Sequence, residues 1–433
     1  MDTTPFITQD TIAFGIVMLT LGFVFYTSSS ENSGWIKFYK IVPSLLMAYM
    51  LPAIFTSLGI IAPEWESIDE AGNITKHESN LYYVASRFLL PAALILMTLS
   101  IDLKAVYNLG PKALIMFLTG TAGIIIGGPI AIILISMVSP ETVGGAGPDA
   151  VWRGLATLAG SWIGGGANQA AMLEIYEYNP KKYGGMVLVD IVVANIWMAV
   201  VLMGIGKSKK IDKWLKADTS AIEKLKEKVS TYASKITRNP TLSDLMVILS
   251  IAFSVVGFSH FGADAVSGFL KTNFEAVSDK SSALSSFGSQ FFWMISIATI
   301  IGIILSFTKF KKYEGAGASK IGSVFIYVLV ATIGMKMDLS KILENPGLIL
   351  IGIVWMTIHV ILLIIVAKLV KAPYFFLAVG SQANVGGAAS APIVAAAFHP
   401  SLATVGVLLA VFGYVVGTYG AMLTAELMRI VAS

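Results

Sequence analysis

Two glycine-rich stretches place uncharged polar side chains inside otherwise apolar segments. They span residues 160–171 and 380–392, within apolar segments near 150–176 and 374–399. Where glycine breaks a helix, the positive N-terminal end of the next half-helix attracts a carboxylate, and freed carbonyls can coordinate Na⁺. Serine, asparagine and glutamine add oxygen ligands and amide donors at the same depth. We therefore predict a solute-binding site formed by Ser161, Gly165, Gly166, Asn168, Gln169, Ser381, Gln382, Asn384, Gly386, Gly387 and Ser390.

Small residues also let helices pack closely in a membrane, and this is the structural alternative to a binding site. Close packing accounts well for the glycines Gly120, Gly123, Gly127 and Gly128. It accounts poorly for two matched stretches that both carry asparagine and glutamine, so we favour a functional role there.

One acidic residue stands alone in an apolar segment. Asp190 lies six residues into the segment that begins near Gly184, and its neighbours on both sides are apolar. A carboxylate inside a membrane is expensive and is by default a functional-site hypothesis. Asp190 could bind Na⁺ or exchange a proton, whereas the alternative is an acid that faces water at the interface. The predicted ion-coupling residues are Asp190, Asn195, Asn168 and Asn384, with a Na⁺ site near Asp190 left open against H⁺.

Other ionisable residues have simpler interpretations. Asp102 and Asp338 each end the third apolar segment of their half of the chain, where we expect helix capping or solvation. We expect His359 to be a hydrogen-bonded packing histidine rather than a proton relay. Since no arginine falls clearly at mid-membrane, recognition of an anion would depend on helix dipoles and amides.

The composition indicates a polytopic α-helical membrane protein. Hydrophobic residues make up 56% of the 433 residues, charged residues only 13%, and the mean hydropathy is +0.77. Apolar runs are continuous rather than alternating, which excludes an outer-membrane β-barrel. The net charge of +4 is too small to suggest a nucleic-acid partner, and the absence of cysteine excludes thiol chemistry. We expect no enzyme activity and no cofactor apart from a coupling ion.

Windows of apolar residues predict five full spans in each half of the chain. In the first half these are residues 11–28, 40–62, 82–101, 112–138 and 184–206, and in the second half 242–258, 289–307, 320–337, 347–370 and 401–429.

A basic linker separates the halves, so that residues 1–206 and 241–433 form two predicted repeats around the linker 207–240. The linker has ten basic residues against four acids, which places it in the cytoplasm by the positive-inside rule. An amphipathic helix is one interpretation of its apolar spacing and a solvated helix is the other. That spacing involves Ile222, Leu225, Val229, Tyr232 and Ile236.

The charged loops fall on consistent sides only if each glycine-rich segment re-enters on the side from which it came. If both segments crossed fully, the basic linker would lie outside. Lys181 and Lys182 oppose this assignment, because it places them outside. Five spans per half is an odd number, which makes the halves inverted repeats. Residues 100–103, followed by Pro111, match residues 336–339, followed by Pro346.

The motifs GGGAN at 164–168 and NVGG at 384–387 carry a family resemblance. The chain resembles the cation–proton-antiporter/anion-transporter clan, which includes glutamate:sodium symporters, 2-hydroxycarboxylate symporters, gluconate permeases and bile-acid transporters. Within that clan it looks most like a bacterial membrane family known as a domain of unknown function. The resemblance covers nearly the whole chain. It implies a transport domain that holds two hairpins, a scaffold domain that forms a homodimer, an elevator-like movement, and a location in the bacterial inner membrane.

We therefore expect an ion-coupled symporter for a small organic anion or zwitterion, such as an amino acid, short peptide or carboxylate. A Na⁺/H⁺ antiporter is the second hypothesis. Antiporters of that type usually place adjacent acids on the core helix, whereas Asp190 stands alone. A membrane subunit of a sodium-pumping enzyme is the third hypothesis, and it requires a soluble partner. The sequence leaves open the solute, the coupling ion and the direction of transport.

Overall fold

The protein is almost entirely helical. The computed structural model describes residues 4–39, 42–68, 74–99, 103–220, 222, 225, 239–278, 285–342, 344–399 and 402–432. Eight helical segments within these residues are long and apolar enough to cross a membrane. They are α1 (Asp10–Ser28), the continuous segment α4–η1–α5 (Leu81–Leu99), α7 (Pro111–Ser136), α10 (Tyr183–Ile205), α13 (Leu242–Asn273), α16 (Ala318–Lys336), α17 (Gly347–Leu369) and α20 (Ala403–Ala432).

Two other predicted spans correspond to shorter helices, α3 (Ser44–Ser57) and α15 (Gln290–Ser306). The glycine-rich segments form α9 (Val151–Ile175) and the pair α18 (Tyr374–Val385) and α19 (Gly387–Phe398). The structure thus confirms a polytopic α-helical membrane protein. The remaining helices are α2 (Ser33–Tyr39), α6 (Leu103–Tyr107), α8 (Pro140–Val143), η2 (Gly147–Asp149), α11 (Ser208–Leu215), α14 (Glu275–Ser278), η3 (Ser285–Gly288), η4 (Lys309–Ala316) and η5 (Leu339–Lys341).

The structure differs from the sequence prediction at two places. Helix α13 continues to Asn273, whereas the predicted span ends at 258. Polar residues after 258 lower the hydropathy, but the hydroxyl of Ser259 bonds the carbonyl of Val255 and the ring of His260 bonds the carbonyl of Arg87. The acidic loop after α3 also contains an antiparallel ribbon of two strands, β1 (Glu64–Ile68) and β2 (Ile74–Glu78).

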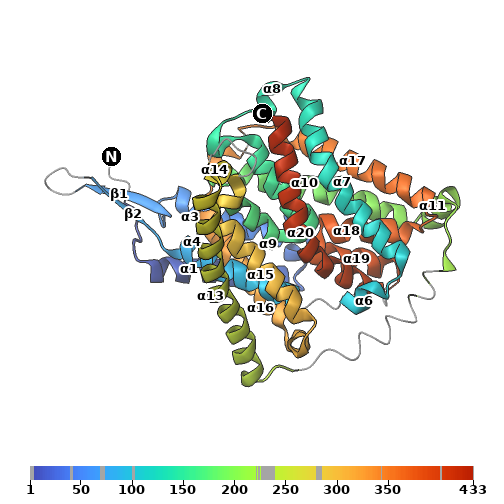
Figure 1. Cartoon of the computed structure of the whole chain (residues 1–433), viewed down its shortest axis with the longest axis horizontal. Helices are drawn as coiled ribbons and strands as arrows, with labels where there is room; N and C mark the ends of the chain where they lie inside the picture. Colours follow the sequence, from blue (N-terminus) through green and yellow to red (C-terminus); the bar gives the residue numbers. More distant parts are fainter. Residues whose placement is uncertain are drawn as a thin grey trace.

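The helices form two groups that lie side by side (Figure 1). The first group contains α1, α3, α5, α13, α15 and α16. The second group contains α7, α9, α10, α17, α18, α19 and α20, and it holds both glycine-rich segments. Each half of the chain supplies three helices to the first group and then the next span, the glycine-rich segment and the last span to the second.

Helices α7 and α17 cross closely and in opposite directions within the second group. A Cβ atom added to Gly123 would lie 3.0 Å from the Cα of His359, and one added to Gly127 would lie 2.6 Å from the Trp355 ring. These glycines therefore serve close helix packing, as the sequence predicts. The contact fixes the two helices behind the glycine-rich segments.

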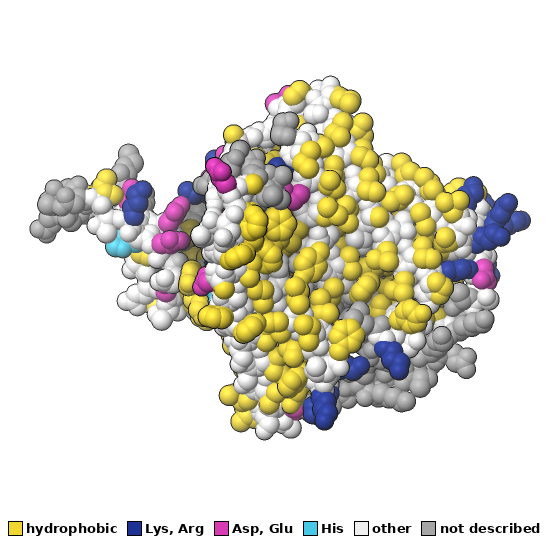
Figure 2. All heavy atoms as spheres, in the orientation of Figure 1, with side chains coloured by type: hydrophobic (Ala, Val, Ile, Leu, Met, Phe, Trp, Pro, Cys, Tyr) yellow, Lys and Arg dark blue, Asp and Glu magenta, His cyan; other side chains and the backbone are white. Residues whose placement is uncertain are grey.

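The outer surface is largely apolar. Figure 2 shows hydrophobic side chains spread over the visible face, whereas lysine and arginine gather near its edges, most densely beside α11. Exposed large hydrophobic residues include Ile126, Ile130 and Leu134 of α7 and Phe258 and Phe261 of α13. A surface of this kind suits contact with lipid chains.

Candidate functional site

The first glycine-rich segment folds back on itself at Gly165. This residue has φ 73° and ψ −173°, which is a left-handed conformation that glycine tolerates. A Cβ atom on Gly160 would lie 2.6 Å from the carbonyl oxygen of Asn168, although eight residues of straight helix span about 12 Å. Farther from the break, the guanidinium of Arg153 donates to the carbonyl of Tyr176. We call residues 151–176 the first hairpin.

The second glycine-rich segment also folds back, between α18 and α19. Gly387 has φ +55° at the break. The hydroxyl of Ser390 donates to the Oε1 atom of Gln382 at 2.8 Å, which joins the two arms near the tip. At the other end, the rings of Tyr374 and Phe398 have centroids 5.9 Å apart. We call residues 374–398 the second hairpin.

The two hairpins open toward opposite ends of the helix group. At the open end, or mouth, of the first hairpin, Lys182 pairs with Asp149 at 3.2 Å and with Glu344 at 3.8 Å. At the mouth of the second hairpin, Lys112 donates to the carbonyl of Lys371 at 3.2 Å. Helix α7 starts beside this second mouth and runs toward the first mouth. Thr142 lies in α8, just after α7, and its carbonyl accepts from the amide of Asn345 at 3.1 Å. Asn345 follows Glu344, which pairs with Lys182 at the first mouth.

Lys181 and Lys182 lie near the first mouth, and their positive charge argues against placing this end outside the membrane. Both lysines have acidic partners. Lys181 pairs with Glu64 at 3.0 Å, and Lys182 has the two partners given above. The hydrogen bond from the Asn179 amide lowers the pKa of the Asp149 carboxyl below its usual value, and the interaction with Lys182 lowers it further. These pairings neutralise much of the positive charge at this end.

Asp190 of α10 joins both arms of the first hairpin. Its Oδ2 atom accepts from the Ser161 hydroxyl at 2.6 Å and from the Gln169 amide at 3.2 Å. Its Oδ1 atom accepts from the indole N–H of Trp162 at 2.7 Å. Asp190 is only 6% exposed. The structure therefore brings three predicted residues together and adds Trp162, which sequence reasoning missed although it directly follows Ser161.

The donors around Asp190 decide what its carboxylate can do in this conformation. An indole N–H can only donate, so it stabilises an anion and cannot serve as an oxygen ligand for a cation. Among the residues that the structure describes, no group of three His, Cys, Asp or Glu side chains could hold a metal ion. Through its three hydrogen bonds, Asp190 acts here as an anchor that fixes the first hairpin to α10.

Asn168 holds the tip of the first hairpin against α20. Its amide nitrogen donates to the carbonyls of Gly164 and Tyr414, at 3.0 and 3.3 Å. Its oxygen accepts from the Thr418 hydroxyl at 2.6 Å. Both donor hydrogens and the oxygen are thus used by the protein itself, so direct contact of Asn168 with a solute stays a prediction.

Asn384 has the same kind of environment in the second hairpin. Its amide nitrogen donates to the carbonyls of Phe117 and Gly380, each at 2.9 Å. Its oxygen accepts from the Thr121 hydroxyl at 2.8 Å. Each asparagine therefore fastens one hairpin to a neighbouring helix through a threonine. Neither threonine partner could be identified from the sequence.

His359 fixes the second hairpin from behind, and it is hydrogen bonded as expected. Its Nδ1 atom lies 2.9 Å from the carbonyl oxygen of Gly120, which can only accept. The ring is therefore protonated at Nδ1, and Nε2 accepts from the Ser381 hydroxyl at 2.8 Å. Ser381 in turn accepts from the indole N–H of Trp197 at 2.8 Å. His359 thus completes this buried chain of hydrogen bonds.

Gln382 carries a donor without a partner. Its side chain is 1% exposed and its Oε1 atom accepts from Ser390, but its Nε2 atom has no hydrogen-bond partner among the described residues. Ser390 lies in the first turn of α19, whose N-terminus has no side-chain cap. A buried amide N–H without an acceptor is costly, and a ligand oxygen would satisfy it.

The other predicted residues lie at the tips or outside the site. Gly165, Gly166 and Gly386 are half-buried at the two breaks, and nothing lies within 4 Å of a Cβ added to Gly387. Asn195 is exposed and donates to the carbonyl of Ile191 in its own helix, so it does not join Asp190. Asp338 caps η5 by accepting from the Ser340 N–H at 2.9 Å, and Asp102 lies outside the described residues.

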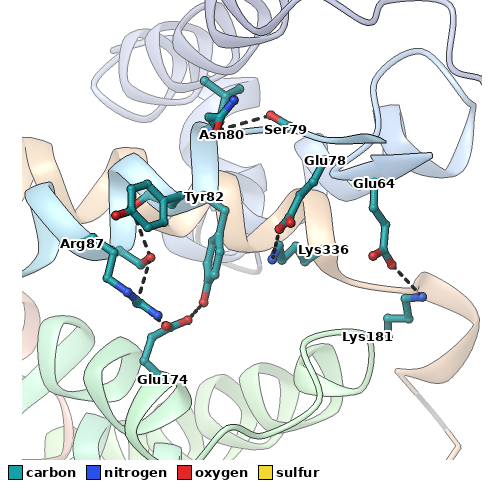
Figure 3. A network of polar contacts seen from close by, with 12 residues as sticks. Glu64, Glu78, Ser79, Asn80, Tyr82, Arg87, Glu174, Lys181 and Lys336 are labelled. Atoms are coloured by element: carbon teal, nitrogen blue, oxygen red, sulfur yellow. Dashed lines mark hydrogen bonds and ion pairs between the residues drawn. The ribbon is translucent and has the colours of Figure 1, made fainter. Parts of the chain in front are cut away.

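A polar network joins the first hairpin to the other helix group (Figure 3). Glu174, at the end of α9, accepts from the Tyr82 hydroxyl and pairs with Arg87. The ammonium group of Lys336 lies 4.1 Å from the Tyr82 ring centroid and pairs with Glu78 at 3.7 Å. The contact between the groups is therefore polar near the first mouth.

Comparisons with known proteins agree with a membrane role. The chain is 24% identical over 394 residues to the "Uncharacterized membrane protein YjcL" of Bacillus subtilis (strain 168), a match covering 88% of this chain and 89% of that protein. The family described as "Protein of unknown function (DUF819)" matches residues 15–431. The chain therefore belongs to the DUF819 family.

Proposed function

We propose that the protein is a secondary active transporter of the bacterial inner membrane. It moves a small organic anion or zwitterion, such as an amino acid, short peptide or carboxylate, together with H⁺ or Na⁺. The observation that carries this proposal is the pair of hairpins that open toward opposite ends of one helix group. Discontinuous helices of this kind form binding sites near the bilayer midplane in secondary transporters. In a membrane both hairpins are re-entrant, with their polar tips shielded by the surrounding helices.

An inverted repeat relates the two halves in this proposal. Aligning Pro111 with Pro346 shifts the numbering by 235, so Gly120 matches Trp355 and Ile124 matches His359. The observed hydrogen bonds join Gly120 to His359 and Ile124 to Trp355. Each contact is thus the image of the other under a twofold axis that exchanges the halves. Alternating access then results from an elevator-like movement of the hairpin group against the other group, which forms the homodimer.

The second hairpin is the better candidate for the anionic part of the solute. Its unpartnered Gln382 amide lies beside the uncapped N-terminus of α19, and both favour a carboxylate oxygen. The three donors that hold Asp190 stabilise its ionised carboxylate, so binding of either H⁺ or Na⁺ requires at least one donor to move away, and the proposal keeps both as coupling ions. A Na⁺/H⁺ antiporter is the alternative, and the solitary acid argues against it.

A thermal-unfolding screen tests this proposal on the purified protein. Candidate carboxylates and amino acids are added with and without Na⁺ at two pH values, since a ligand stabilises the folded state it binds. We expect one solute class to raise the unfolding temperature, and Gln382→Leu to abolish that rise. Asn195→Leu, at an exposed position, serves as the control. A solute-induced rise that is unchanged in Gln382→Leu would place the anion elsewhere, and uptake into vesicles that depends on neither H⁺ nor Na⁺ would contradict ion coupling.

A further inference from the structure

Helix α11 presents a basic surface where the last span of the first half ends. It begins at Ser208, three residues after α10 ends at Ile205. Lys209, Lys210, Lys213 and Lys216 are exposed. Figure 2 shows a dark-blue cluster of lysine and arginine side chains at the place of α11 in Figure 1. Leu215 is buried on the opposite side. We call these four lysines the α11 lysines.

The aromatic residue of α11 lies at the same surface. Trp214 is 54% exposed, and the ammonium group of Lys368 lies 4.8 Å from its ring centroid. Tryptophan is enriched at membrane interfaces because its ring is apolar while its N–H can be hydrated. A short helix with exposed lysines, an exposed tryptophan and a buried leucine has the pattern of an interfacial helix.

The acid of α11 points into the protein and caps the second hairpin. The Oδ1 atom of Asp212 accepts from the backbone N–H of Tyr374 at 2.7 Å. Tyr374 is the first residue of α18, and its N-cap residue is Pro373, whose side chain has no acceptor. Asp212, which lies in α11, therefore takes the place of the N-cap side chain that α18 lacks. The Tyr374 hydroxyl adds a hydrogen bond to the carbonyl of Val201 in α10, at 2.9 Å.

The chain after α11 makes a second connection to the same mouth. The N–H of Asp218 donates to the carbonyl of Lys371 at 3.1 Å. Its carboxylate pairs with Lys112 at 3.0 Å, and Lys112 also donates to the carbonyl of Lys371. The Ser220 hydroxyl and then Lys112 lower the pKa of Asp218 to about 2, so this carboxylate stays ionised at physiological pH. Both acids near α11 are thus directed to protein partners, which leaves its lysines facing outward.

We propose that the α11 lysines bind anionic phospholipid headgroups, and that this binding holds the mouth of the second hairpin through Asp212. Because α11 follows directly from a membrane span, its lysines lie at headgroup level, where clustered lysines bind anionic lipid. The headgroups keep α11 at the surface, and α11 in turn keeps Asp212 beside Tyr374. The proposal does not depend on which solute the protein moves.

Lipid titration of the purified protein in neutral detergent tests the binding. Phosphatidylglycerol raises the unfolding temperature of the wild type more than phosphatidylcholine does, and the variant with all four α11 lysines changed to glutamine loses this difference. The matched control changes Lys309, Lys311, Lys312 and Lys320 to glutamine, which removes the same charge beside and within η4. The proposal is overturned if the α11 variant keeps the full difference, or if the control loses as much.

Hydrogen–deuterium exchange at the hairpin mouth tests the coupling without an added label. In nanodiscs that contain phosphatidylglycerol, the peptide with the Tyr374 amide exchanges more slowly than in pure phosphatidylcholine nanodiscs. Asp212→Ala removes this difference but keeps the lipid-dependent rise in unfolding temperature, because the lysines remain. Equal exchange rates in both lipids would overturn the coupling. The same protection by a soluble polyanion in phosphatidylcholine would overturn the assignment to lipid.

Discussion

The carboxylate of Asp190 accepts a hydrogen bond from the indole of Trp162 at 2.7 Å, across 28 residues of sequence. This bond and that from Ser161 come from one arm of the first hairpin, and the bond from Gln169 comes from the other. One buried acid thereby holds the hairpin closed and attaches it to α10. Asp190 thus has a structural role that does not depend on its proposed role in ion coupling.

Replacing Asp190 by asparagine tests both aspects of its role. The amide nitrogen of the new side chain would face donors, so at least one buried N–H or O–H loses its acceptor. We expect a loss of about 1–3 kcal/mol in the free energy of unfolding, and loss of ion-dependent uptake. Chemical unfolding in detergent gives the first quantity and reconstituted vesicles give the second. Asn195→Ala, on the exposed side of α10, should change neither. Full ion dependence in Asp190→Asn would remove Asp190 from the coupling mechanism.

Gly417 of α20 packs directly against Gly164 of the first hairpin, and substitution of Gly417 tests how tight this contact is. A Cβ on Gly417 would lie 2.3 Å from the Cα of Gly164, and backbone on both sides leaves no flexible group to yield. Gly417→Ala should therefore lower the free energy of unfolding by about 1–3 kcal/mol. Gly257→Ala is the matched control, because nothing lies within 4 Å of its added Cβ and alanine favours a helix by up to about 1 kcal/mol. Equal effects of the two substitutions would show that the tip is loosely packed.

The positions of the glycine breaks and of the lone acid could be predicted from sequence, because each departs sharply from its apolar surroundings. The sequence proposes Ser161, Gln169 and Asp190 as separate candidates, and the structure places them in hydrogen-bond contact. The partners of the two asparagines could not be predicted, since Thr121 and Thr418 lie 263 and 250 residues away along the chain. Threonine is also common in apolar helices, so its type gives no signal.

Local polarity explains where the predicted elements differ from the structure. Ser259 and His260 lower the hydropathy of α13, yet both bond carbonyl groups, so the helix continues. The predicted amphipathic helix at 222–236 lies outside the described residues except for Ile222 and Leu225. The amphipathic helix that the structure describes in the linker is α11, whose eight residues are too short for a clear periodic signal.

The proposed re-entrant arrangement predicts which positions face the same side of the membrane. The chain has no cysteine, so single cysteines can be labelled cleanly with impermeant thiol reagents. Ser67→Cys and Asn179→Cys should react from outside, because Glu64 and Lys181 join their segments at one end of the molecule. Ser220→Cys should react only from inside, beside the second mouth. Labelling of Asn179→Cys from inside alone would mean that the first glycine-rich segment crosses the membrane.

Cross-linking tests whether the two helix groups must move relative to each other. Glu64 of the β-ribbon and Lys181 after the first hairpin pair across the boundary at 3.0 Å, and both are exposed. Cysteines at these two positions, joined by a short bifunctional reagent, would tie the hairpin group to the other group. We expect this link to abolish solute uptake into vesicles, and cleavage of the reagent to restore it.

The matched control links Glu66 and Lys76, which pair at 3.5 Å across the two strands of the ribbon. This link carries the same chemistry in the same region but stays within the ribbon, so uptake should continue. Because the ribbon belongs to one side of the boundary only, the comparison separates restricted movement from damage by the reagent. Uptake at the normal rate with Glu64 and Lys181 fully linked would contradict an elevator-like movement, since the hairpin group could then no longer slide past its neighbour.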